Sequence, residues 1–170
     1  MRVVLDIETD ELNASVVNCI VAKNIDTNVF TVFDPSNMHV FKNWSKDIDK
    51  YIMHNGLSFD APVLNRLLGV EIKPSQVTDT LILSQMFNPL REGGHSLGAW
   101  GDRFKFPKGS IENFAHYTHE LRKYCQQDVD ITHKLYNHLK TEGKGFSKSS
   151  IHMEHQVRVI IDQQEKNGFY

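Results

Sequence analysis

The chain has 170 residues, of which 40% are hydrophobic and 24% charged, enough for one domain with a buried core. Its net charge of −2, with nine histidines, excludes the wide basic surface of proteins that coat long DNA or RNA, although divalent cations can still attract a few phosphates. No apolar segment approaches the roughly 18 residues of a membrane span, and the N-terminus lacks a signal-peptide pattern. With two cysteines that stand singly, Cys19 and Cys125, the sequence predicts a reduced, intracellular protein with no membrane partner.

In the first half of the chain, β-branched and apolar runs bounded by turn-forming residues predict four strands, of which the second and third form a hairpin. These strands cover residues 2–8, roughly 15–24, roughly 28–33 and 51–53. Apolar residues at helical spacing then predict a series of helices. They cover residues 57–68, the segment TDTLILSQMF that Asp79 opens, a short segment around SLGAWG, and residues 113–140.

The C-terminal part of the chain differs in composition. Residues 141–150, TEGKGFSKSS, are small and basic and predict a flexible linker. A last helix over residues 151–166 is expected outside the core, with an apolar face that must pack back on the chain, pair with a second copy or leave the helix frayed. Strands that come first and then mix with helices predict an α/β domain with a mixed sheet.

Two carboxylates interrupt the first strand, VVLDIETD. Side chains alternate along a strand, so Asp6 and Glu8 project from the same face, where like charges repel. Burying them without a partner is costly. Taken alone, the pair is weak evidence for a functional site, because a strand end with both acids facing water also explains it.

Two further segments carry acidic residues in similar positions. In HNGLSFD, Asp60 lies near the start of a helix, where the helix macrodipole alone can account for it. In YCQQD, Tyr124 and Asp128 lie four residues apart and therefore on one helix face. Asp130 points elsewhere, and we expect it to pair with Lys134.

In this order, D-x-E on a first strand, N-x3-F-D at a helix start and Y-x3-D on a late helix resemble the three motifs of the DEDD superfamily of 3′–5′ exonucleases, in its tyrosine-bearing subclass. The resemblance spans Asp6 to Asp128. It implies a ribonuclease H-like fold, in which a mixed sheet is flanked by helices, and hydrolysis of a single-stranded DNA 3′ end to 5′-mononucleotides.

The resemblance also implies a centre of two Mg²⁺ or Mn²⁺ ions, which carboxylate oxygens suit. Asp6 would bridge both ions, Glu8 and Asp128 would complete the tighter site, and Asp60 would hold the second ion, through water. Tyr124 would orient the attacking water, since a phenol with a pKa near 10 is a poor base at neutral pH.

Several neighbouring residues allow two interpretations. His54 and Asn55 would contact sugar or phosphate, or form a turn with Gly56. Phe59 would stack on a base, although a core position is favoured. A zinc site is not expected from the histidine pairs, which have no cysteine at ligand spacing: His116, His119, His152 and His155. Trp100 is expected in the core.

The segments TDTLILSQMF and HSLGAWGDRFK look like the middle of the proofreading domain in family A DNA polymerases of the T-odd bacteriophage type. The terminal MEHQVRVIIDQQEKNGFY looks like the segment that joins this domain to the polymerase domain. We therefore expect an exonuclease domain at 1–142, and a linker and helix at 143–170 that lead towards a polymerase domain in the same or a separate chain. If the chain is phage-encoded, it would act in the host cytoplasm.

Two rival functions remain open. An exoribonuclease of the same superfamily would carry the same acidic residues, although the polymerase-like segments argue against it. A catalytically silent scaffold domain would not need to retain all five site residues.

Overall fold

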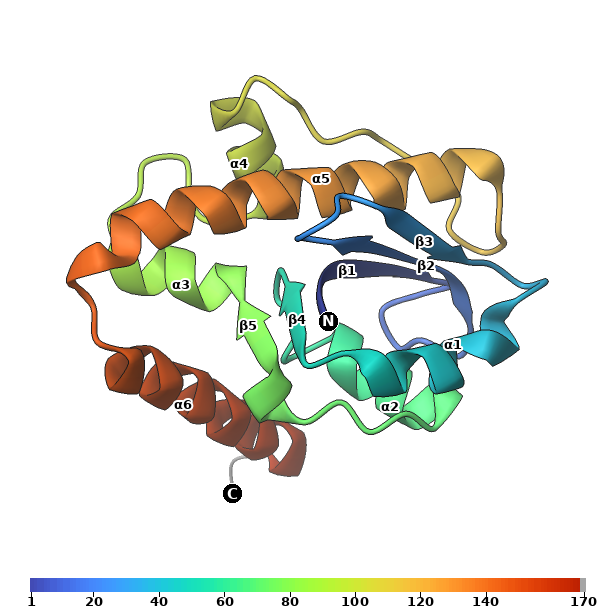
Figure 1. Cartoon of the computed structure of the whole chain (residues 1–170), viewed down its shortest axis with the longest axis horizontal. Helices are drawn as coiled ribbons and strands as arrows, with labels where there is room; N and C mark the ends of the chain where they lie inside the picture. Colours follow the sequence, from blue (N-terminus) through green and yellow to red (C-terminus); the bar gives the residue numbers. More distant parts are fainter. Residues whose placement is uncertain (169–170) are drawn as a thin grey trace.

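The computed structural model describes residues 1–168, in which five strands form a mixed sheet covered by helices on both faces (Figure 1). The strands are β1 (Arg2–Thr9), β2 (Val17–Asn24), β3 (Phe30–Phe33), β4 (Lys50–Met53) and β5 (Val77–Asp79). The helices are α1 (Met38–Trp44), α2 (Asp60–Leu68), α3 (Thr80–Phe87), α4 (Leu97–Arg103), α5 (His119–Glu142) and α6 (Lys148–Asn167). Short 3₁₀ helices cover Ser45–Asp47, Pro74–Gln76 and Gly143–Gly145.

The sheet has the order β3-β2-β1-β4-β5, with β1 in the middle. The first three strands form an antiparallel meander, whereas β4 and β5 run parallel to β1, as expected when helices connect them. The register pairs Asp6 with Val21 and Glu8 with Cys19, and it shifts between Glu8 and Thr9. Both acidic residues therefore lie on the central strand, close to its C-terminal end.

Alternation along β1 divides the core between the two faces of the sheet. Val3, Leu5 and Ile7 pack with residues of α1 and α2, whereas Val4 packs with Leu121, Cys125 and Val129 of α5. Figure 1 shows α5 lying across one face of the sheet and α1 and α2 on the other. Asp6 and Glu8 share the face of Val4, so both point towards α5.

The structure corrects several expected boundaries. The strand β5 and the helix α1 were not predicted, and α2 begins at Asp60 because residues 57–59 belong to the preceding turn. Helix α5 begins at His119 instead of 113, where the Thr118 hydroxyl accepts a hydrogen bond from the Leu121 amide at 3.0 Å and caps the helix.

The expected linker at 141–150 is largely helical, because α5 continues to Glu142 and α6 begins at Lys148, capped by Ser147. Helix α6 also lies against the domain: His155 is buried, and Val159 packs on the core. The apolar residues of its outer face remain exposed: Met153, Val157, Ile160 and Ile161. No helix among residues 1–168 is long and apolar enough to cross a membrane.

Candidate active site

The first two acidic residues lie where β1 meets α5. The carboxylate oxygens of Asp6 and Glu8 and the sulfur of Cys125 all lie within 4.8 Å of one another. The Cys125 thiol donates to Oδ2 of Asp6 at 3.3 Å. Glu8 is 8% exposed, so the strand end does not simply present its acids to water.

Asp60 reaches this region from the opposite side of β1, as the first residue of α2. The turn before it is tight: Asn55 has a φ of +64°, and a Cβ at Gly56 would lie 2.2 Å from Cβ of Met53. Only glycine fits at position 56. The turn thus places the buried Asp60 carboxylate near the C-terminal end of β1, where the backbone of Ile7 lowers its pKa against the larger effect of burial.

Helix α5 contributes the fourth acid and the tyrosine. Asp128 is buried and Tyr124 is half-buried on the same helix face, as their spacing predicts. Asp130 lies apart and pairs with Lys23 at 2.8 Å, so the expected pairing with Lys134 is wrong. Lys23 belongs to β2, so the sequence of the helix alone could not indicate this ion pair.

Lys108 is a residue of the site that sequence reasoning missed. Its ammonium lies 2.6 Å from Oδ2 of Asp128 and 4.8 Å from the ring centroid of Tyr124. The loop between α4 and α5 brings it there, since the Gln127 side chain donates to the carbonyl of Pro107. A lone lysine in a polar loop carries no periodic signal that could have identified it.

The electrostatics show four acids in one region of low solvent access. Burial, followed by the charge of Asp128, raises the pKa of Asp6 well above its usual range and that of Glu8 to about 8. Burial also raises the pKa of Asp60, to about 7, and that of Asp128. Burial lowers the pKa of Lys108, but the attraction of Asp128 outweighs it, so this lysine stays charged.

This donor set fits hard divalent cations. All four candidate ligands are carboxylates, and Oδ1 of Asp128 is buried without a hydrogen-bond partner among the described residues. A cation there would satisfy that oxygen and offset the negative charges that, after burial, raise the pKa values of Asp6 and Glu8. Cys125 is not a fitting ligand, because burial and then its contact with Cys19 raise the pKa of its thiol.

An apolar cavity of about 350 Å³ adjoins Glu8. Phe59 and Phe114 line it, together with Leu12, whose side chain is 90% exposed. Phe114 also packs edge-on against Tyr124, with ring centroids 5.8 Å apart. Phe59 packs on the core, as expected, and also lines this cavity; stacking on a base stays a prediction. The sequence analysis did not single out Leu12 or Phe114.

His54 and Asn55 take part in the turn. The Asn55 amide donates to Oδ1 of Asp79 at 2.9 Å, and Nδ1 of His54 lies 2.9 Å from the Thr80 hydroxyl. Burial lowers the pKa of His54 to about 4, so its ring is neutral at physiological pH. His116, His119 and His152 are exposed, and no metal-ligating group among residues 1–168 includes a histidine.

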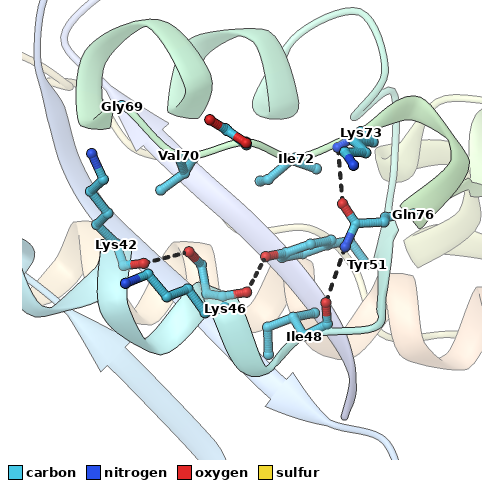
Figure 2. Close-up of a pocket in the computed structure, with 11 residues that line it drawn as sticks. Lys42, Lys46, Ile48, Tyr51, Gly69, Val70, Ile72, Lys73 and Gln76 are labelled. Atoms are coloured by element: carbon cyan, nitrogen blue, oxygen red, sulfur yellow. Dashed lines mark hydrogen bonds between the residues drawn. The ribbon is translucent and has the colours of Figure 1, made fainter.

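A separate cavity of about 620 Å³ lies between the C-terminal ends of α1 and α2 (Figure 2). Lys42, Lys46 and Lys73 surround it, and Glu71 is its one acidic lining residue. The hydroxyl of Tyr51, which is labelled in Figure 2, donates to the carbonyl of Ser45. This cavity contains none of the predicted site residues.

Comparisons with known proteins agree with this architecture. No protein-family model matches the chain. A DNA-directed DNA polymerase of Enterobacteria phage T3 is 22% identical over 69% of the chain, and the match spans only 25% of that polymerase.

Three solved structures share the fold. Brucella melitensis NrnC bound to pGG matches 94% of this chain and 85% of its own, with a TM-score of 0.66 and 19% identity. Exonuclease X in complex with 5′-overhanging duplex DNA matches 91% and 99%, with a TM-score of 0.53 and 16% identity. Phi29 DNA polymerase complexed with primer-template DNA matches 84% and 32%, with a TM-score of 0.55 and 15% identity. The predicted ribonuclease H-like fold, a mixed sheet flanked by helices, is confirmed.

Proposed function

We propose that the chain is a metal-dependent 3′–5′ exonuclease that hydrolyses single-stranded DNA from its 3′ end to 5′-mononucleotides. One observation carries this proposal: Asp6 and Glu8 lie close together on β1, and Asp60 of α2 and Asp128 of α5 lie near enough for their charges to raise the pKa of Asp6. Such a concentration of mutually repelling acids is expected where divalent cations bind. The fold that the chain shares with Exonuclease X and with Phi29 DNA polymerase supports the proposal further.

Asp6, Glu8, Asp60 and Asp128 would hold two Mg²⁺ or Mn²⁺ ions. When bound, such ions make a water molecule more acidic and stabilise both the attacking and the leaving oxygen of an in-line displacement. Tyr124 would orient the water, since burial raises the pKa of its phenol and makes it a poorer base. The water would lose a proton as its oxygen bonds to phosphorus, the bond from phosphorus to the 3′ oxygen would break, and that oxygen would take up a proton, so that no proton is gained or lost overall.

The apolar cavity beside Glu8 would receive the terminal nucleotide. Phe59 and Phe114 offer rings on which a base can stack without sequence preference, and Leu12 adds an apolar contact, which suits an enzyme that removes any nucleotide. His54 and Asn55 would act on the substrate indirectly, by shaping the turn that carries Asp60.

The phage polymerase similarity supports a role in DNA replication, as the proofreading domain or the separate exonuclease subunit of a family A polymerase. In that role residues 1–142 would form the exonuclease domain and residues 143–170 would connect it to the polymerase, inside the host cell.

A second candidate is a 3′–5′ exoribonuclease, favoured by the similarity to NrnC bound to pGG. A third is a silent scaffold domain, against which the retained carboxylates weigh. Degradation of end-labelled single-stranded DNA and RNA of one sequence, with Mg²⁺ and with excess chelator, separates the three. We expect faster hydrolysis of DNA; faster hydrolysis of RNA favours the second candidate, and no hydrolysis of either favours the third.

A further inference from the structure

Helix α6 contacts the turn before Asp60 through hydrogen bonds to Ser58. The Ser58 hydroxyl donates to Oδ2 of Asp162 at 2.8 Å and accepts from Nε of Arg158 at 2.8 Å. Arg158 and Asp162 also form an ion pair at 2.9 Å, one helical turn apart. Ser58 lies two residues before Asp60, so α6 contacts the chain immediately before a candidate metal ligand.

A second contact reaches the same turn through Asp79. The Asp79 carboxylate accepts from the amides of Asn55 at 2.9 Å and Leu57 at 3.1 Å. The backbone amide of Asp79 in turn donates to Nε2 of His155, in α6, at 2.9 Å. Nδ1 of His155 lies 2.8 Å from the carbonyl of Ile151, so a neutral ring satisfies both contacts by donating from Nδ1 and accepting at Nε2.

The turn itself has little freedom to absorb a displacement. Asn55 is left-handed, Gly56 has no room for a side chain, and Asp60 follows directly as the first residue of α2. Hydrogen bonds have defined lengths and angles, so they fix position more strictly than apolar contacts do. A shift of α6 would therefore move the Asp60 carboxylate relative to β1.

We propose that α6 is a positioning element of the metal centre, which acts on Asp60 through Ser58 and Asp79. Arg158, Asp162 and His155 are the positioning residues on the helix. The inference rests on the proposed function, because it assigns Asp60 a metal to hold. Misplacing a reacting group by about 1 Å costs on the order of 100-fold in rate, so a partial loss of this contact should be measurable.

The test uses the full chain with the variants Arg158→Met and Ser58→Ala, and with Lys166→Met as a matched control. Arg158→Met removes the donor to Ser58 and retains most of the side-chain stem, whereas Lys166→Met removes an exposed cation from the end of the same helix. The readouts are the Mn²⁺ concentration at half-maximal rise of the melting temperature, and kcat and KM on single-stranded DNA. We expect Arg158→Met to raise the Mn²⁺ midpoint about tenfold and lower kcat about tenfold, with KM within about twofold of the wild-type value. Lys166→Met should change neither.

Arg158→Met could detach or unfold the whole of α6, and Ser58→Ala keeps the proposal testable in that case. This variant removes the hydroxyl of the turn before Asp60 and leaves the Arg158–Asp162 ion pair within α6 intact. It should show the same two changes, and Ser58→Thr, which retains a hydroxyl, should restore both values. Wild-type values for Ser58→Ala, or equal changes in Lys166→Met, would overturn the role of α6. If the wild-type chain neither gains stability from Mn²⁺ nor hydrolyses DNA, the proposed function itself has failed, which is a distinct result.

Discussion

The ammonium of Lys108 lies 2.6 Å from Oδ2 of Asp128, within a group of four acidic side chains. In the described structure it is the cation that offsets their repulsion: its charge lowers the pKa values of Asp6 and Glu8 against the effects of burial. A divalent cation on Asp128 would compete with this ion pair for the same carboxylate.

We therefore expect Lys108→Met to lower stability in chelator by about 1 kcal/mol, since the pair is partly exposed and solvent weakens it. Adding Mg²⁺ should raise the melting temperature of Lys108→Met more than that of the wild type, because the bound ion would supply the positive charge that the missing ammonium no longer provides. Lys123→Met, at an exposed position of α5, serves as the control. An equal rise in both variants would show that Lys108 does not compete with the metal.

Tyr124→Phe removes one hydroxyl and leaves the ring, its packing on Phe114 and the carboxylates in place. If the hydroxyl orients the attacking water, the single-turnover rate constant should fall about 10- to 100-fold, while the metal-induced rise in melting temperature stays at its wild-type value. An unchanged rate constant would remove Tyr124 from the mechanism.

The raised carboxyl pKa values predict how stability depends on pH. The pKa values of Glu8, about 8, and Asp60, about 7, lie above their unfolded values, so the folded protein binds more protons in this range. In chelator, the contribution of these two acids to stability should be fully present below about pH 4 to 4.5 and should be lost as pH rises through 7 and 8. The affinity for Mg²⁺ should increase over the same interval, because ions bind the deprotonated acids.

Thermal melts from pH 5 to 9, with chelator and with Mg²⁺, measure both trends. Glu8→Gln should flatten the decrease seen in chelator. A wild-type stability that rises from pH 6 to 8 in chelator would contradict the arrangement of the four acids.

The apolar cavity predicts a binding effect at Leu12. Its side chain is 90% exposed, so Leu12→Ala should leave folding unchanged, whereas the loss of an apolar contact with the terminal nucleotide should raise KM for single-stranded DNA about five- to tenfold. Leu90→Ala is a matched control, because Leu90 is 92% exposed and does not line this cavity. Equal KM values for the two variants would place the terminal nucleotide elsewhere.

The sequence predicted those parts of the site that depend on local periodicity. Alternation along a strand put Asp6 and Glu8 on one face, and helical spacing did the same for Tyr124 and Asp128. The three-residue strand β5 is too short to show a period, although its Asp79 holds the turn before Asp60. Lys108 and the contacts of α6 join residues about 20 to 100 positions apart, and such pairing follows from the tertiary fold alone.

The central claim is that the carboxylates at the end of β1 form a metal-dependent exonuclease site. Asp128 and Asp130 provide the most direct test, because they are the same residue type on one helix, and only Asp128 faces the other site acids, while Asp130 pairs with Lys23. The measurement is the rate at which 5′-mononucleotides leave the 3′ end of single-stranded DNA in Mg²⁺. We predict a rate about 1,000-fold lower for Asp128→Ala, since a metal ligand supports several kcal/mol of transition-state stabilisation, and a rate within about twofold of wild type for Asp130→Ala. Wild-type hydrolysis by Asp128→Ala, or undiminished hydrolysis in excess chelator, would contradict the claim.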